Sequence, residues 1–93
     1  MDKREASALL ATELTRFRAR SYDDLVKMMA DVHVTEVTGL SGSEYTIEVE
    51  VMWDSPREKG AVRVVGAIDD GRLPGALVPL TESFIVAPFG RSS

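Results

Sequence analysis

The chain has no cysteine and only one histidine among its 93 residues. Without thiols, disulfides, thiolate metal sites and cysteine nucleophiles are excluded. Histidine is the side chain best suited to acid–base chemistry at neutral pH, and His33 has no second histidine or thiol to work with. We therefore expect His33 to be a structural residue, and the sequence favours a protein that is not an enzyme.

Long apolar runs are also missing. No stretch approaches the roughly 18 apolar residues of a membrane-spanning helix, and the opening MDKREASALLATEL is charged from its second residue. These two features and the absence of cysteine predict a cytoplasmic protein with no membrane partner.

Several motifs that carry known chemistry are absent as well. The sequence contains neither GxxxxGK[ST] nor GxGxxG nor GxSxG, so we expect no bound cofactor. Asp69 and Asp70 could ligate a hard cation together with Asp54 or Glu82, but their spacing matches no EF-hand loop. Adjacent acids followed by glycine are ordinary turn chemistry, so we expect no metal site there.

The charge of the chain is negative and unevenly placed. The net charge is −4, which argues against nucleic acid as a partner. Residues 32–60 contain six acidic and two basic residues, so most of the acidity belongs to this segment. Arg16, Arg18 and Arg20 form the main basic cluster, and their place at the end of an expected helix fits stabilisation of the helix dipole.

The first third of the chain has the periodicity of helices. Apolar residues recur at helical spacing over residues 3–19 and include Ala6, Leu9, Leu10, Leu14 and Phe17. Ser21 followed by Asp24 resembles a capping box and predicts a second, shorter helix, so that the helical part covers residues 3–30.

The rest of the chain has the period of β-strands. HVTEVT is rich in β-branched residues, and YTIEVEVMW alternates strictly, with Tyr45, Ile47, Val49, Val51 and Trp53 on one face. GLSGSE between them predicts a hairpin. AVRVVGAI predicts a third strand, in which Gly66 indicates a bulge or a close backbone approach.

The end of the sheet is harder to place. Asp69 to Gly71 predict a tight turn, and ALVPL at residues 76–80 predicts a fourth strand. Pro79 has no amide donor and would restrict this strand to a sheet edge or to a point where its amide side faces solvent. The closing segment TESFIVAPFG is compatible with a fifth strand, a helical turn or an ordered tail.

These elements predict one α+β domain over residues 1–93, helical over 3–30 and sheet over 32–87. One or two N-terminal helices would pack on one face of an antiparallel meander of about four strands, because short turns join neighbouring strands. The uncovered face of the sheet is expected to be polar.

The strings SYDDLVKMM, YTIEVEVMWD, VRVVGAIDDG and VPLTESFIVAPFG resemble a family of small bacterial proteins with an N-terminal helical segment and an antiparallel sheet. The likeness covers about residues 21–90, and the loop GRLPGAL departs from it by lacking an aromatic residue. The resemblance implies the fold and no activity.

Two classes of function remain open. The first is a small non-catalytic protein-binding or adaptor domain, with an acidic strand face at Glu48 and Glu50 and an apolar contact surface at Phe84 and Phe89 for a protein partner or homodimer. The second is a small-molecule-binding protein or small enzyme that uses a sheet face. Its pocket would come from the following residues: His33, Tyr45, Trp53, Asp54 and Arg63.

Overall fold

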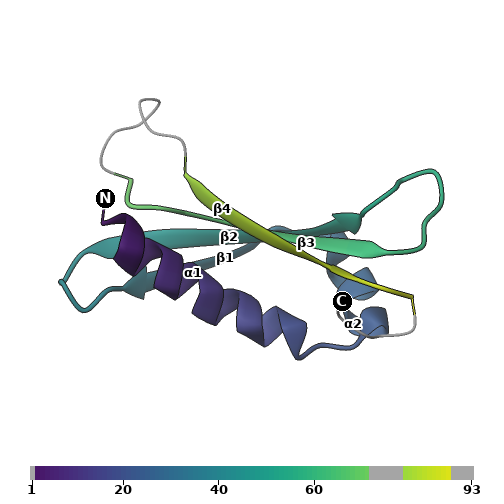
Figure 1. The fold of residues 1–93 in the computed structure, drawn as a ribbon, viewed down its shortest axis with the longest axis horizontal. Coiled ribbons are helices and arrows are strands. Elements are labelled where there is room, and N and C mark those ends of the chain that lie inside the picture. The colour runs from purple at the N-terminus through teal and green to yellow at the C-terminus, as the bar shows by residue number, and fades with distance from the viewer. Residues whose placement is uncertain (1, 72–78, 89–93) are drawn as a thin grey trace.

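A computed structural model describes residues 2–71 and 79–88 and has an α+β architecture, as the sequence predicts. Its helical elements are α1 (Lys3–Arg18), α2 (Tyr22–Lys27) and the 3-10 turn η1 (Met28–Ala30). Its strands are β1 (His33–Thr38), β2 (Glu44–Trp53), β3 (Val62–Asp69) and β4 (Leu80–Val86). The four strands form one antiparallel sheet in the order β1-β2-β3-β4, so each strand pairs with its sequence neighbour (Figure 1).

Both α-helices begin at a side chain that caps their first turn. The Asp2 carboxylate accepts a hydrogen bond of 3.1 Å from the backbone N–H of Glu5, and the Ser21 hydroxyl accepts one of 3.1 Å from that of Asp24. Each cap satisfies an N–H group that has no partner within its helix. The capping box read from Ser21 and Asp24 therefore marks the start of α2 correctly.

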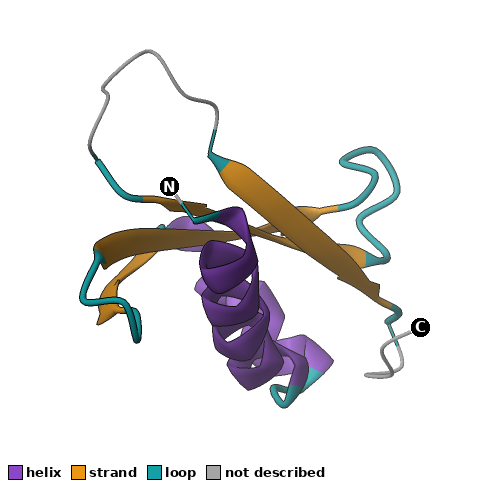
Figure 2. Cartoon of the chain, turned by 60° about the vertical axis from the view of Figure 1, so that its left-hand side comes forward, coloured by secondary structure: helices purple, strands orange, loops and turns teal. Residues whose placement is uncertain are grey.

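The helices cover one face of the sheet and leave the other uncovered (Figure 2). Helix α1 crosses this face mainly over β3 and β4. Helix α2 packs near the end of β2 and the start of β3. The core between the layers consists of apolar side chains from α1, α2 and the strands: Ala6, Leu10, Leu14, Phe17, Leu25, Tyr45, Ile47, Val49, Val51, Val62, Val64, Ile68, Phe84 and Val86. Four of the five residues predicted for the inner face of the first helix belong to it, and Leu9 packs at its border.

Gly66 is the point of closest approach between α1 and the sheet. A Cβ atom at this position would lie 2.9 Å from Leu10 Cδ1 and 3.0 Å from Leu14 Cδ2. The pairing of β3 with β2 runs without interruption through Val49↔Gly66, so the close approach predicted from the sequence is the correct alternative and the bulge is not.

The last described strand lies later in the sequence than expected. Residues 76–78 of the predicted fourth strand lie outside the described residues, and β4 begins at Leu80, directly after Pro79. The segment whose conformation was left open, TESFIV, forms most of this strand. Its alternating buried residues, Phe84 and Val86, pair with Val64 and Val62 of β3, so contact with α1 and β3 selects the strand among the alternatives. Strand β4, which begins directly after Pro79, is an edge strand of the sheet.

We predict that Gly66→Val destabilises the protein by about 1–3 kcal/mol, because two buried leucines occupy the space that the new side chain needs. The matched control is Ala67→Val on the next residue of β3, which faces away from α1 and should change the free energy of unfolding by less than about 0.5 kcal/mol. Urea unfolding followed by circular dichroism measures both. Equal effects of the two substitutions would contradict the close packing of α1 on β3.

Candidate functional site

The sheet face that the helices do not cover is called here the open face. Strand register assigns its residues, because directly paired residues point to the same side. It comprises the following residues: Val34, Glu36 and Thr38 of β1; Glu44, Thr46, Glu48, Glu50 and Met52 of β2; Arg63, Val65, Ala67 and Asp69 of β3; and Thr81, Ser83 and Ile85 of β4.

A band of carboxylates crosses the open face. Glu48 and Glu50 are exposed on β2, as the alternation of this strand predicts. Glu36 of β1 and Asp69 of β3 both pair with Thr46 of β2. They therefore lie on either side of Thr46, which neighbours Glu48 on the same face. All four acidic residues are exposed.

The basic side chain on this face is already engaged. Arg63 donates a hydrogen bond of 2.9 Å from Nε to Asp54 Oδ1, and its second terminal nitrogen lies 2.7 Å from the same oxygen. Its other terminal nitrogen donates to the Ser83 hydroxyl at 3.3 Å. Because Asp54 balances Arg63, the carboxylate band keeps its negative charge.

The open face is less polar than the sequence analysis predicts. Val34 is 58% exposed and Met52 is 37% exposed, and Val65 and Ala67 are half-buried on the same side. The expectation of a polar face was only partly right, because Val34 of β1, Met52 of β2 and Val65 and Ala67 of β3 place apolar side chains among its polar residues. The face therefore combines carboxylates with accessible apolar surface.

Phe84, one of the two residues predicted for an apolar contact surface, is not exposed as expected. Phe84 is only 7% exposed and belongs to the core, where Val64 is its partner across the strands. The Arg18 guanidinium carbon lies 4.3 Å from the centre of the Phe84 ring, in a cation–π contact. Phe84 was placed on a surface because its strand was not recognised, and Phe89 lies outside the described residues.

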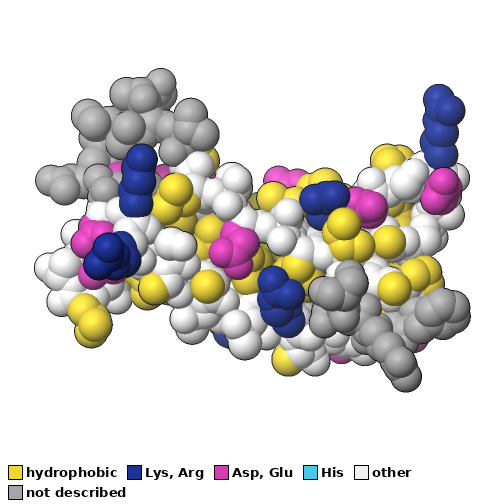
Figure 3. All heavy atoms as spheres, in the orientation of Figure 1, with side chains coloured by type: hydrophobic (Ala, Val, Ile, Leu, Met, Phe, Trp, Pro, Cys, Tyr) yellow, Lys and Arg dark blue, Asp and Glu magenta, His cyan; other side chains and the backbone are white. Residues whose placement is uncertain are grey.

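The three arginines at the end of α1 do not act as one patch. Arg18 stacks on Phe84, and Arg16 lies 3.3 Å from Glu13 one turn earlier in the helix. On the face seen in Figure 3, the basic side chains of the described residues stand apart from one another. This arrangement fits their predicted role in stabilising the helix end.

A hydrogen-bond network that the sequence does not reveal joins the start of α1 to the β1–β2 hairpin. The Glu5 carboxylate accepts hydrogen bonds from the Ser41 hydroxyl at 2.7 Å, the Ser41 backbone N–H at 3.0 Å and the Tyr45 hydroxyl at 2.7 Å. The Ser41 hydroxyl, the Tyr45 hydroxyl and the Ser41 N–H lower the pKa of Glu5, in that order of importance. The bond to Glu5, followed by burial, raises the pKa of Tyr45 to about 12.

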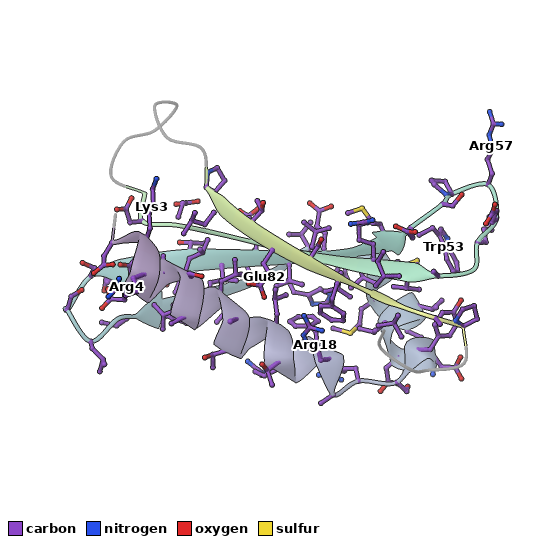
Figure 4. All side chains as sticks on the ribbon, in the orientation of Figure 1. Lys3, Arg4, Arg18, Trp53, Arg57 and Glu82 are labelled. Carbon is purple, nitrogen blue, oxygen red and sulfur yellow. The ribbon has the colours of Figure 1, made fainter. Side chains whose placement is uncertain are left out.

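The residues considered for a small-molecule pocket are not brought together. Tyr45 and Trp53 lie near opposite ends of β2, which at about 3.3 Å per residue separates them by about 26 Å. The Tyr45 hydroxyl donates a hydrogen bond to Glu5 in the first turn of α1. Trp53 lies far from that turn, which Lys3 and Arg4 mark in Figure 4. His33 packs edge-on against Phe17, with ring centres 5.9 Å apart, and its Nε2 lies 3.2 Å from the Met28 carbonyl oxygen.

The acidic residues weighed as metal ligands are likewise dispersed. Asp69 lies at one end of the β2–β3 pairing, Asp54 lies just beyond the other end, and Glu82 sits opposite Gly66 on the helix side. The Asp69 carboxylate accepts a hydrogen bond of 2.9 Å from the N–H of Gly71, as the turn chemistry predicts. Within residues 2–71 and 79–88, no three histidine or acidic side chains form a cluster that could hold a metal ion. Across the same residues, no helix has the length and apolarity needed to cross a membrane.

We predict that Glu5→Gln weakens the fold at neutral pH and that its stability approaches that of the unsubstituted protein in acid. The folded pKa of Glu5 lies below the unfolded value of 4.5, so the ionised group stabilises the fold above pH 4.5. This stabilisation is lost as the pH falls through the folded pKa. Urea midpoints from neutral to acid pH test this, with exposed Glu58→Gln as the control whose curve should parallel that of the parent protein. If the urea midpoints of Glu5→Gln and the parent protein differed by the same amount at every pH, the ionised Glu5 carboxylate would not be the stabilising group.

We predict that Tyr45 ionises near pH 12 and that the fold loses stability between pH 10 and that value. A folded pKa above the unfolded pKa of 10.0 means that the protonated hydroxyl stabilises the fold below pH 10 and that this contribution disappears above it. Phenolate absorbance of the folded protein should show a late transition that is missing in Tyr45→Phe. A transition of Tyr45 close to pH 10 would show that the bond to Glu5 does not form in solution.

Comparison of the chain with known proteins does not assign it to a family. No protein-family model matches the chain, and no curated protein or solved structure matches it.

Proposed function

We propose that this protein is a non-catalytic cytoplasmic binding module whose open face holds a basic, partly apolar segment of another protein. The observation that carries the proposal is the carboxylate band of Glu36, Glu48, Glu50 and Asp69 beside exposed apolar side chains of the same face. Arg63 does not neutralise this band, because its guanidinium is bound to Asp54 and Ser83.

The spacing of the carboxylates favours an extended partner segment. Glu48 and Glu50 are two residues apart on one strand, so their Cα atoms are about 6.8 Å apart. Alternate side chains of an extended peptide have the same spacing. A segment with Lys or Arg at alternate positions could therefore place successive cations over successive carboxylates.

Charge alone would make such binding weak. An exposed ion pair contributes only about 0.2–1 kcal/mol, and physiological salt screens it further. Val34 and Met52 supply exposed apolar surface next to the band, and burying it would add affinity that salt does not screen. Recognition then combines electrostatic attraction, which speeds encounter, with apolar contact, which slows dissociation.

We predict that Glu48→Lys with Glu50→Lys abolishes binding of a synthetic peptide of alternating Lys and Val residues. The matched control is Asp31→Lys with Glu58→Lys, which changes the net charge equally at exposed positions outside the open face. Fluorescence anisotropy at low and high salt measures affinity, and amide chemical shifts of the labelled protein locate the peptide.

The expected result is salt-dependent binding with shifts confined to the open face, lost in the first variant and kept in the control. Equal weakening of both variants would show that only net charge matters and would contradict the proposed face. Shifts centred on α1 or α2 would contradict it as well. A lysate capture with the same pair of variants then identifies the natural partner.

A further inference from the structure

A groove of about 610 Å³ runs between the first half of α1 and the start of β4. Its volume is within the range of small-molecule sites in proteins. Leu10 and Leu80 supply apolar surface along the groove, and Ser7 and Ala11 line it with small side chains from α1. The groove lies beside α1 on the helix side of the sheet, so a ligand bound there does not depend on the function proposed for the open face.

A carboxylate without a partner stands at one end of this groove. Glu82 is half-buried on the helix side, opposite Gly66 in the pairing of β4 with β3. Leu10 packs against Gly66, so Glu82 lies level with the middle of α1, as Figure 4 shows. Across residues 2–71 and 79–88, the Glu82 side chain makes no hydrogen bond or ion pair. Partial burial of an unpaired carboxylate costs free energy, which a cationic group of a ligand would offset.

Two cations stand at the other end of the groove, where the helix itself does not favour them. Lys3 and Arg4 lie in the first turn of α1, at the positive end of the helix dipole (Figure 4). Arg16 and Arg18, in contrast, lie in the last turn, where cations are stabilising. Both Lys3 and Arg4 line the groove, and within the part of the chain that the structure describes neither side chain makes an ion pair. Helix stability therefore does not account for their position.

The distance between the two charged ends matches a short peptide. Leu10, which is level with Glu82, follows Lys3 by seven residues, or about 10 Å along a helix that rises about 1.5 Å per residue. An extended tripeptide also spans about 10 Å, at about 3.3–3.6 Å per residue. Its two ends carry opposite charges, as the two ends of the groove do. A ligand with charge of only one sign would leave one end of the groove unpaired.

We propose that this groove binds a tripeptide with free ends and an apolar middle side chain. The α-ammonium group of the ligand pairs with Glu82, and its α-carboxylate pairs with Lys3 and Arg4. The middle side chain packs on the apolar surface between these ends, and the hydroxyls of Ser7 and Thr81 are hydrogen-bonding groups for the peptide units. The ligand binds in one direction, because exchange of its ends would place like charges together.

The experiment uses the peptide Ala-Leu-Ala with its ends free, acetylated, amidated or both. Amide chemical shifts of the labelled parent protein should show saturable binding of the free peptide at the first half of α1 and the start of β4. Acetylation and amidation should each weaken binding about tenfold, because each removes a hydrogen bond between charged groups. Absence of binding at millimolar peptide, or equal binding of the doubly blocked peptide, overturns the proposal.

Variants of the protein assign each end of the ligand. In Glu82→Gln, acetylation should no longer change the affinity, whereas amidation should still weaken it about tenfold. In Lys3→Gln with Arg4→Gln, amidation should lose its effect and acetylation should keep it. The opposite pattern would overturn the proposed direction of the ligand.

Matched controls separate these contacts from net charge. Glu58→Gln removes one negative charge, and Arg57→Gln with Lys59→Gln removes two positive charges, at exposed positions of the β2–β3 loop. Both controls should keep the effects of acetylation and amidation seen in the parent protein, and circular dichroism checks that every variant is folded. Loss of these effects in the controls overturns the assignment of the contacts to Glu82, Lys3 and Arg4.

Discussion

The packing of α1 on β3 at Gly66 is the contact on which the rest of the structure depends. Leu10 and Leu14 fit against the sheet only because position 66 has no side chain. The close approach brings the apolar face of α1 over β3 and β4, whose residues Val64 and Phe84 belong to the same core. It also fixes the direction of α1, so that its first turn lies beside the β1–β2 hairpin and Glu5 can reach Ser41 and Tyr45.

The same packing leaves the molecule asymmetric. The helical segment ends at Ala30 and covers one face of the sheet, with least cover over β1. The described chain measures 40 × 25 × 19 Å, with the long direction along the strands (Figure 1). A small domain buries a limited fraction of its surface, so the open face and the outer edge of β1 stay accessible. The proposed binding of a partner segment uses the open face.

Carboxylates have two different roles in this fold. Glu5 is held by three hydrogen bonds and connects a helix to a hairpin, which lowers its pKa. Glu48 and Glu50 are exposed on a strand and contribute little to folding. Their position on one accessible face, where the described Arg63 is bound to Asp54 and Ser83, supports the proposal that they recognise a basic segment.

Local patterns in the sequence determined most elements of the fold. The helical spacing around Leu10 and Leu14, the cap at Ser21 and the alternation of β2 all report local geometry, which a sequence expresses directly. The exposure of Glu48 and Glu50 followed from the same alternation. Only the tertiary structure decided the contact of Glu5 with Ser41 and Tyr45, because residues 36 and 40 positions apart carry no periodic signal. The choice of strand for Leu80–Val86 and the burial of Phe84 also depended on packing against α1 and β3, since the segment itself fits several conformations.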